Sequence, residues 1–336
     1  MARRAFLHIG TAKSGTTYLQ EVWWRHRDAL RDRGLLLPGV ALRDHFHAAA
    51  LVKGMDVIVD QLGPDERGTW SRLLEEVRHW PGDALISHEH FSDSPADAAR
   101  RAVAEAADAG EVHLLLTVRD LGRVLPSAWQ QRVKQGARQT YGAFLDAVRQ
   151  ERTDQKFWRY QDVPGILERW AADLPAERVH LVVVPAAGAP RDALWRRTSR
   201  VLGVDTDDLD AEPRRPNDSL GIVEAELLRR VNAAMPRSAR TVAMTRLTKG
   251  AFARDLLAGS APTESFVLPA AHAEWVRARS EVTVAALTGR GYDVIGDLAD
   301  LLPARPRDGR SPEEVDDAEV LAAATTVVSR MIAQGR

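Results

Sequence analysis

The stretch GTAKSGTTYLQ, residues 10–20, has the residue types of an anion-binding loop. It follows an apolar run and precedes an amphipathic pattern that begins near Thr16, so we expect it to join a buried strand to a helix. At such a junction, successive backbone N–H groups converge on negative charge. The two glycines allow a close backbone approach, Lys13 supplies a cation, and Thr16 and Thr17 supply hydroxyl donors. These residues predict a bound anion; the alternative is a tight turn with a solvated lysine.

The position of the lysine distinguishes this loop from that of an ATPase. The loop that binds nucleoside triphosphates has its lysine directly after the second glycine. Here Lys13 lies two residues before Gly15. A kinase that uses ATP and Mg²⁺ would also need an aspartate at a strand end, and Asp120 is the candidate for it. The kinase therefore stays open as an alternative enzyme.

Candidate bases gather in the stretch LISHEHFSDSP, residues 85–95, where a second apolar run ends. His88, Glu89 and His90 would lie at the carboxyl end of a parallel strand, which is where open α/β folds place their chemistry. Alternation along the strand end puts His88 and His90 on the side opposite Glu89. A hydroxyl nucleophile needs a group that takes its proton, and either Glu89 or a histidine could do so.

The elements that must position these residues are visible as four short apolar runs, at residues 5–9, 84–88, 112–118 and 179–184. They are continuously apolar, as expected for parallel strands covered on both faces. Amphipathic patterns at 16–33, 66–79, 95–109, 121–150 and 164–173 predict the helices between them, and 34–39 is a further candidate for an edge strand. The predicted fold class is α/β, with an open parallel β-sheet flanked by helices.

The strand signal fades after about residue 190, where residues 192–203, 219–233, 265–289 and 312–334 have helical patterns. The last of these starts with Ser311 as N-cap and Glu314 three residues later. We therefore predict one domain, with an α/β core at 1–190 and a mainly helical continuation at 191–336. That continuation supplies an acceptor-side cap and a C-terminal helix.

Composition excludes several classes of protein. The chain has 336 residues, a net charge of −1 and no cysteine, which argues against nucleic-acid binding and excludes disulfides and thiolate metal sites. No stretch approaches the 18 apolar residues or so of a membrane span, and the apolar run after the N-terminal arginines is too short for a signal peptide. We expect a cytoplasmic protein without membrane insertion. The sequence says nothing of its oligomeric state.

The loop resembles that of the sulfotransferases that use 3′-phosphoadenosine-5′-phosphosulfate (PAPS). Their 5′-phosphosulfate loop has the form K-[ST]-G-T-[ST] after the first strand, as in HIGTAKSGTTYLQ here. The resemblance implies a P-loop-like fold in which five residues bind the phosphosulfate: Lys13, Ser14, Gly15, Thr16 and Thr17. It also implies that Lys13 stabilises charge on the oxygen between phosphate and sulfate.

A second match to the family lies in TVRDLGRVLPSAWQQ, residues 117–131. The family's 3′-phosphate motif has an arginine at the strand end and a serine about eight residues later, which implies that Arg119 and Ser127 bind the 3′-phosphate. A late Lys-Gly loop closes on this phosphate in many members, and TRLTKGAF at 245–252 offers Lys249 or a plain interhelical loop. Segments 160–184, 214–232 and 289–303 resemble bacterial members of the family.

The resemblance also bears on the base and the acceptor. The glycan-sulfating branch has a glutamate general base at this strand end, which implies Glu89, whereas hormone-type members use a histidine, which keeps His90 open. Resembling bacterial sequences often carry a histidine near residues 43–54, so we assign His47 together with His88 to the acceptor; the alternative for His45 and His47 is a surface helix start with polar histidines. A metal cluster of His45, His47, His88 and His90 lacks the helical H-E-x-x-H spacing.

The resulting prediction is an enzyme that transfers the sulfuryl group of PAPS to a hydroxyl, releasing 3′,5′-adenosine bisphosphate and requiring no metal. The expected acceptor is a sugar hydroxyl of a glycan, a glycolipid or a glycosylated natural product. The alternatives are the kinase described above and a non-catalytic protein that binds a nucleotide or glycan.

Overall fold

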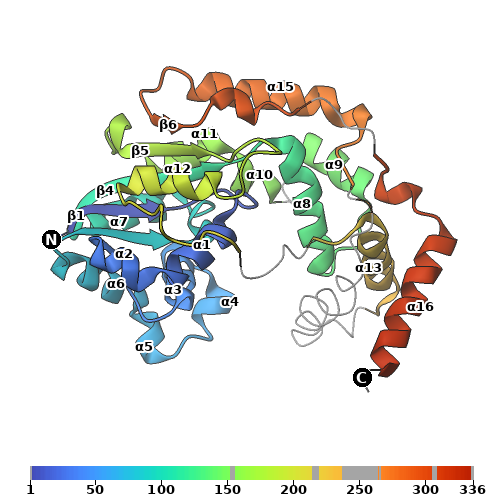
Figure 1. Cartoon of the computed structure of the whole chain (residues 1–336), viewed down its shortest axis with the longest axis horizontal. Coiled ribbons are helices and arrows are strands. Elements are labelled where there is room, and N and C mark those ends of the chain that lie inside the picture. Colours follow the sequence, from blue (N-terminus) through green and yellow to red (C-terminus); the bar gives the residue numbers. More distant parts are fainter. Residues whose placement is uncertain are drawn as a thin grey trace. The chain divides into compact units, whose positions relative to one another are not determined.

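The structure is a computed structural model of the whole chain, and it describes residues 2–151, 156–213, 219–236, 264, 266–304 and 309–333 (Figure 1). The chain divides into two compact units, each built from three segments. Residues 1–120, 156–214 and 280–302 form the first, and 121–155, 215–279 and 303–336 form the second. Residues 121–155 thus belong to the second unit and residues 280–302 to the first, and the description of one domain with a core at 1–190 stays a prediction.

The first unit contains a six-stranded parallel sheet with the strand order β2-β3-β1-β4-β5-β6 (Figure 1). β1 pairs with both β3 and β4, so the carboxyl ends of these three strands are neighbours. The predicted fold class, an open parallel sheet flanked by helices, is confirmed. The strands are β1 Ala2–His8, β2 Leu35–Leu36, β3 Asp83–Ser87, β4 Gly110–Val118, β5 Val179–Val183 and β6 Asp293–Ile295.

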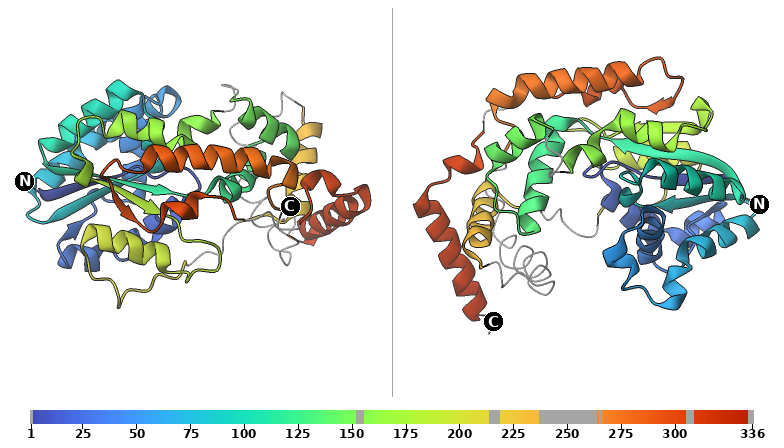
Figure 2. Two further views of the ribbon diagram at one scale, coloured as in Figure 1. Left: turned by 90° about the horizontal axis from the view of Figure 1, so that it is seen from above. Right: turned by 180° about the vertical axis from the view of Figure 1, so that it is seen from behind.

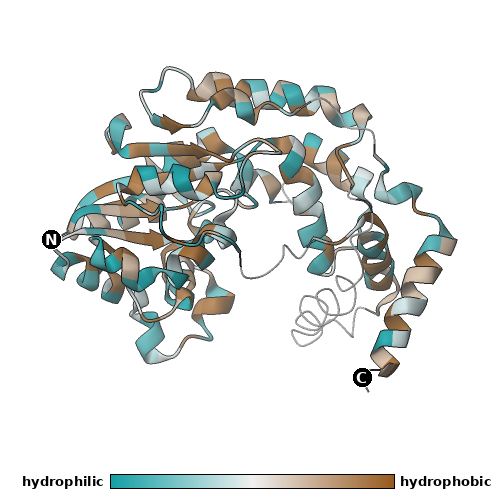
Figure 3. Ribbon diagram, viewed as in Figure 1, coloured by the Kyte–Doolittle hydropathy of each residue, from teal (hydrophilic) through white to brown (hydrophobic). Residues whose placement is uncertain are grey.

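Successive side chains of each strand enter two different apolar layers. Leu7 and Ile86 pack in the layer that holds residues of the helices at 42–53, 69–79, 96–107 and 163–170, and Phe6 and Leu85 pack with residues of the helices at 16–25, 27–32 and 193–202. Figure 2 shows helices on both sides of these strands, and Figure 3 shows that the strands are mainly hydrophobic. Burial on both faces explains why the strands appear in the sequence as unbroken apolar runs.

The helices of the first unit follow the strands in the alternating order expected of crossover connections. Short 3₁₀ turns lie at Glu89–Phe91 (η1), Ala176–Arg178 (η3) and Leu298–Leu301 (η6). The α-helices are α1 Thr16–Arg25, α2 Arg27–Asp32, α3 Leu42–Lys53, α4 Asp56–Val59, α5 Pro64–Arg67, α6 Thr69–His79, α7 Ala96–Ala107, α10 Phe157–Gln161, α11 Val163–Trp170 and α12 Ala193–Leu202. Helix α15, Ala270–Leu287, ends in this unit.

All four predicted strands and the edge strand are present, but β6 was not predicted. This strand has only three residues and pairs with β5 at the edge of the sheet. Ile295 is its one deeply buried side chain. Three residues are too few for a period-2 signal. The long helix predicted at 16–33 is divided into α1 and α2 at His26, whose backbone is not helical.

The second unit is helical in its described part, with α8 Leu121–Lys134, α9 Tyr141–Arg149, α13 Ile222–Ala234 and α16 Asp317–Ala333. Trp129, Tyr141 and Phe266 pack with ring centroids 5.3–5.4 Å apart and are buried. Ser311 and Glu314 form the predicted capping box, but on a 3₁₀ turn, Pro312–Glu314 (η7), so the last helix begins later than predicted. Within the described residues, no helix combines the length and apolar character needed to cross a membrane.

Candidate active site

The loop between β1 and α1 has a backbone shaped for close approach. Lys13 has a φ of 68° and Gly15 a φ of 88°, both in the left-handed region. For a lysine this conformation costs about 1 kcal/mol or more, so surrounding contacts must hold it. Helix α1 begins at Thr16 directly after this turn, and its first N–H groups have no acceptor within the helix. The predicted junction of strand, loop and helix is confirmed.

Two side chains from elsewhere in the first unit hold carbonyl oxygens of the loop. Gln161 Nε2 donates a hydrogen bond to the Ala12 oxygen at 2.6 Å, and Arg119 Nη1 donates one to the Lys13 oxygen at 3.1 Å. Because the N–H of a trans peptide points opposite to its carbonyl, the Lys13 N–H is turned away from Gln161. The Ser14 N–H, in the peptide that Arg119 anchors, is used within the loop, since it donates to the Thr11 oxygen at 3.3 Å. An anion at this loop would meet the Lys13 N–H and the start of α1.

Ser14 has an internal role in this loop. Its side chain is fully buried, and its hydroxyl donates to the Thr11 oxygen at 2.6 Å and lies 2.7 Å from Thr117 Oγ1. The single hydroxyl proton is therefore used within the protein. Thr16 is buried as well, whereas Thr17 is exposed at the start of α1. Of the three predicted hydroxyl ligands, the Thr17 side chain is the one that reaches solvent.

Lys13, Arg119 and Glu89 are coupled electrostatically, so the structure brings three predicted site residues together. Burial, and next the Arg119 guanidinium, lower the pKa of the Lys13 ammonium, and the Glu89 carboxylate partly offsets this lowering. Two neighbouring cations disfavour each other's charged form, which is the direction of the Lys13 pKa shift. A negatively charged ligand at the loop would reduce this repulsion.

Glu89 is the first residue of η1, just beyond the end of β3. Its Oε2 accepts a long hydrogen bond of 3.4 Å from Gln20 Nε2 and lies 3.9 Å from His88 Nδ1. Burial raises the pKa of Glu89, but attraction to His88 in the acid range where its ring is protonated, a backbone hydrogen bond, the same attraction to His90, and Gln20 outweigh it, and the net pKa is lowered. The carboxylate is ionised at neutral pH and can accept a proton.

The prediction that His88 and His90 face away from Glu89 is wrong. β3 ends at Ser87, and the following 3₁₀ turn removes the strand alternation on which that prediction depended. The two imidazoles stack with centroids 5.0 Å apart, and His88 Nδ1 accepts the His90 backbone N–H at 3.1 Å. Burial lowers the pKa of His88 to about 4, so its ring is neutral at neutral pH.

The two histidines of α3 have different surroundings. His45 is fully buried; its Nε2–H donates to the Pro38 oxygen at 2.9 Å, and its Nδ1 accepts the Ser87 N–H at 3.1 Å. Both nitrogens thus brace the backbone near the end of β3. His47 is also buried, with Nδ1 3.8 Å from Glu66 Oε1. Its contact with an acceptor stays a prediction, and no metal-binding group of three or more ligands occurs among the described residues.

An ion pair between Lys53 and Asp93, beside the histidines, was not predicted from the sequence. Lys53 Nζ lies 2.6 Å from Asp93 Oδ1 and donates to Tyr160 Oη at 3.3 Å. The positive charge of Lys53 contributes to lowering the pKa of His90, after the larger effect of burial. His90 lies 6.4 Å from the Tyr160 ring, centroid to centroid. The three polar residues come from distant segments, so no local pattern could reveal them.

Two predicted 3′-phosphate residues lie outside the first unit. Ser127 is half-buried in the first two turns of α8, in the second unit. Lys249 falls outside the described residues. Their part in phosphate binding therefore stays a prediction, and Arg119 is the 3′-phosphate candidate that the structure places at the loop.

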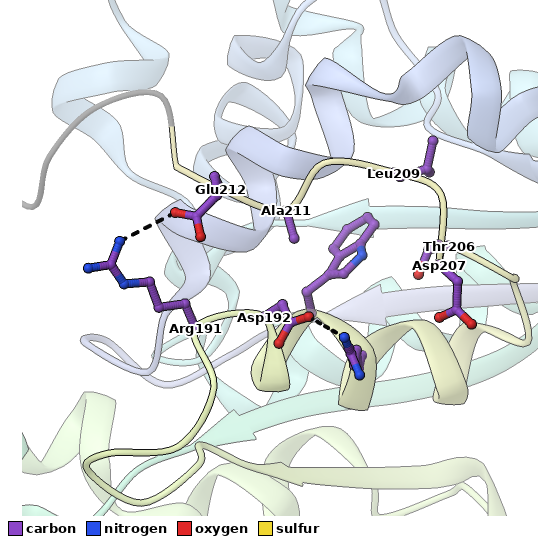
Figure 4. Close-up of a pocket in the computed structure, with 9 residues that line it drawn as sticks. Arg191, Asp192, Thr206, Asp207, Leu209, Ala211 and Glu212 are labelled. Carbon is purple, nitrogen blue, oxygen red and sulfur yellow. Dashed lines mark ion pairs between the residues drawn. The ribbon is translucent and has the colours of Figure 1, made fainter.

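A separate pocket of about 360 Å³ lies beside α12 (Figure 4). Ion pairs cross its rim, from Arg191 to Glu212 at 3.5 Å and from Arg196 to Asp192 at 2.6 Å. Four of the five charged side chains that line it are therefore paired with each other, and Asp207 is the fifth. It is lined by Arg191, Asp192, Trp195, Arg196, Thr206, Asp207, Leu209, Ala211 and Glu212, none of which was predicted for the active site.

Comparison with known proteins gives one structural likeness. No protein-family model matches the chain, and no curated protein matches it. A crystal structure of a sulfotransferase from Alicyclobacillus acidocaldarius aligns with a TM-score of 0.43 and 19% sequence identity, over 73% of this chain and all of that one. At this TM-score and identity the likeness carries no argument, and the case for an activity rests on the side chains of the loop and of the β3 end.

Proposed function

We propose that this protein transfers the sulfuryl group of PAPS to a hydroxyl acceptor. The observation that carries the proposal is the loop itself, in which anchored carbonyls, a helix start and two cations meet beside an ionised carboxylate. Its sequence, Lys13 to Thr17, is the one expected for a 5′-phosphosulfate loop. We further propose that Arg119 contacts the 3′-phosphate, as a permanent cation suited to a dianion.

The proposed reaction is an in-line displacement at sulfur. Glu89 accepts the proton of the acceptor hydroxyl as the new oxygen–sulfur bond forms. The bond between sulfur and the 5′-phosphate oxygen breaks, and its electron pair stays on that oxygen, giving 3′,5′-adenosine bisphosphate. Lys13 and the loop N–H groups stabilise the charge that develops there. No step in this sequence needs a divalent metal, so we expect transfer without one.

The side chains near Glu89 support an acceptor with a flat or ring-shaped face. The Phe46 ring lies 5.3 Å from His88 and 5.8 Å from His90, and these two imidazoles stack on each other. Sugar rings and aromatic alcohols both pack against such faces. We propose a sugar hydroxyl, since a carboxylate base at this position is the feature implied for glycan sulfation.

The test is calorimetric titration with 3′,5′-adenosine bisphosphate in the absence of magnesium. We expect the wild type to bind with micromolar affinity, and Arg119→Ala to weaken binding roughly 10- to 100-fold, the loss of one charge-assisted contact. Arg101→Ala is the matched control, because this exposed arginine pairs with Asp97 on α7 and should leave binding unchanged.

The opposite result would identify a different enzyme. Binding of ATP with Mg²⁺ and none of the bisphosphate would overturn the proposal in favour of the kinase. Binding of the bisphosphate without sulfuryl transfer to any hydroxyl acceptor, including simple phenols and sugars, would favour a non-catalytic nucleotide-binding protein.

A further inference from the structure

A buried row of polar side chains crosses the carboxyl ends of β3, β1 and β4. His8 Nδ1 lies 2.7 Å from Ser87 Oγ, and His8 Nε2 lies 3.2 Å from Thr117 Oγ1. Thr117 Oγ1 in turn lies 2.7 Å from Ser14 Oγ in the loop. All four side chains are at most 2% exposed. Neither the proposed chemistry nor the predicted site uses His8, Ser87 or Thr117.

The proton positions in this row follow from its end in the loop. The Ser14 hydroxyl donates to the Thr11 carbonyl, which can only accept. Ser14 Oγ must therefore accept from the Thr117 hydroxyl in their shared contact. Because the one hydroxyl proton of Thr117 is donated in the hydrogen bond to Ser14, Thr117 Oγ1 must accept a hydrogen bond from His8 Nε2–H. Each hydroxyl has one proton, so no other arrangement satisfies all three contacts.

The other half of the row follows from the ring of His8. Burial, the largest effect, lowers the pKa of His8 to about 3, so the ring is neutral and Nδ1 is an acceptor. The Ser87 hydroxyl then donates to Nδ1, and Ser87 Oγ accepts from Gln20 Nε2 at 3.3 Å. The same Gln20 amide contacts the Ser87 carbonyl oxygen at 3.2 Å and the Glu89 carboxylate at 3.4 Å, so its two N–H groups are shared among three acceptors. The row is thus a one-directional chain from the β3 end to the loop.

We propose that His8 is a positioning residue that holds the donor loop and the Glu89 carboxylate in a fixed relation. This inference rests on the proposed function, because it concerns the geometry between the loop and the base. His8 contacts neither the donor nor the acceptor in this account. It acts through Thr117 and Ser14 on one side and through Ser87 and Gln20 on the other.

The packing around His8 fits a fixed ring. The Trp23 indole meets it edge-on at 5.2 Å between centroids, which limits rotation of the imidazole. The loop backbone approaches the hydrogen-bonded row closely at Gly10, where a Cβ atom would lie 2.4 Å from Thr117 Oγ1 and 2.9 Å from His8 Nε2. The loop therefore rests directly on the His8–Thr117 contact.

A matched pair of variants at Thr117 tests the hydrogen-bonded row without removing a group that binds PAPS. Thr117→Val keeps the shape but cannot pass a hydrogen bond, whereas Thr117→Ser keeps the hydroxyl. We expect Thr117→Val to reduce kcat/KM for PAPS roughly 10- to 100-fold, the order of the two buried hydrogen bonds that it breaks, and Thr117→Ser to change it less than threefold. Equal activity of the two variants would overturn the proposal. Urea unfolding of both establishes that they are folded.

A second pair tests the ring itself. His8→Gln retains one acceptor and one donor on a side chain of similar reach, and His8→Leu retains neither. We expect His8→Gln to recover most of the activity that His8→Leu loses. Activity that is equally low in folded His8→Gln would contradict the chain, because the acceptor and donor would then not suffice.

The proton arrangement can be measured without any activity. Nitrogen NMR of the imidazoles should show His8 as a neutral Nε2–H tautomer at neutral pH. An Nδ1–H tautomer or an imidazolium would overturn the proposal even if sulfuryl transfer is confirmed. Conversely, failure of the wild type to bind 3′,5′-adenosine bisphosphate would refute the proposed function while leaving the tautomer result intact, so the two failures are distinguishable.

Discussion

At the scale of single residues, the proposed chemistry depends on a carboxylate that is ionised beside histidines that are neutral. The pKa of Glu89 is lowered in spite of its burial, and burial lowers the pKa of His88 to about 4. The base form of Glu89 should thus persist through the neutral range. We expect Glu89→Gln to reduce kcat roughly 10²- to 10⁴-fold, the usual contribution of a general base, while calorimetry shows bisphosphate affinity within a few-fold of wild type.

His88→Asn is the control for this residue-scale prediction. Its amide oxygen can still accept the His90 N–H that His88 Nδ1 accepts now, so the turn at η1 should keep its cap. We expect this variant to retain much of the wild-type kcat, whereas the loss of an imidazole face proposed for the acceptor should raise the KM of the acceptor. A fully active Glu89→Gln together with an inactive His90→Gln would instead make His90 the base.

At the scale of elements, the packing of the segment formed by β1, the loop and α1 depends on one small residue, Gly10. A Cβ atom at Gly10 would lie 2.4 Å from Thr117 Oγ1 and 2.6 Å from Thr16 Cγ2. Overpacking of this kind typically destabilises a protein by about 1–3 kcal/mol, so we expect Gly10→Ala to lower the urea midpoint. Gly68→Ala is the control, because the nearest atom to its Cβ would be 3.7 Å away and its φ is −87°. An unchanged midpoint in Gly10→Ala would show that the loop is free to move.

The same elements show how far the sequence alone could predict this site. The loop and the β3 end are local patterns that pointed to Lys13 and Glu89, and the family resemblance implied Arg119; in the structure Lys13 is electrostatically coupled to both. The anchors of the loop are not local. Gln161 reaches Ala12 across 149 residues of chain, and a glutamine in a helix has no feature that announces such a contact. The orientation of His88 and His90 was mispredicted because β3 ends at Ser87, one residue before the end of the predicted strand at 84–88, and a 3₁₀ turn follows.

At the scale of the whole molecule, the buried neutral histidines should make stability depend on acid. Burial lowers the pKa of His8 to about 3 and of His45 to about 4, below the ordinary value of 6.5. Between those values the unfolded chain binds more protons than the folded one, so the free energy of unfolding falls as pH falls. The stabilisation is complete above pH 6.5 and is lost progressively toward pH 4.

The expected loss is on the order of 3 kcal/mol for a histidine such as His45, at about 1.4 kcal/mol per unit of pKa. Urea unfolding between neutral pH and pH 4 should therefore show a falling midpoint. His45→Gln should flatten this dependence, because an amide can still donate to Pro38 and accept from Ser87 but does not titrate. A midpoint that stays constant across this range would mean that water reaches these rings before they protonate, and the buried row at the strand ends would then not be rigid.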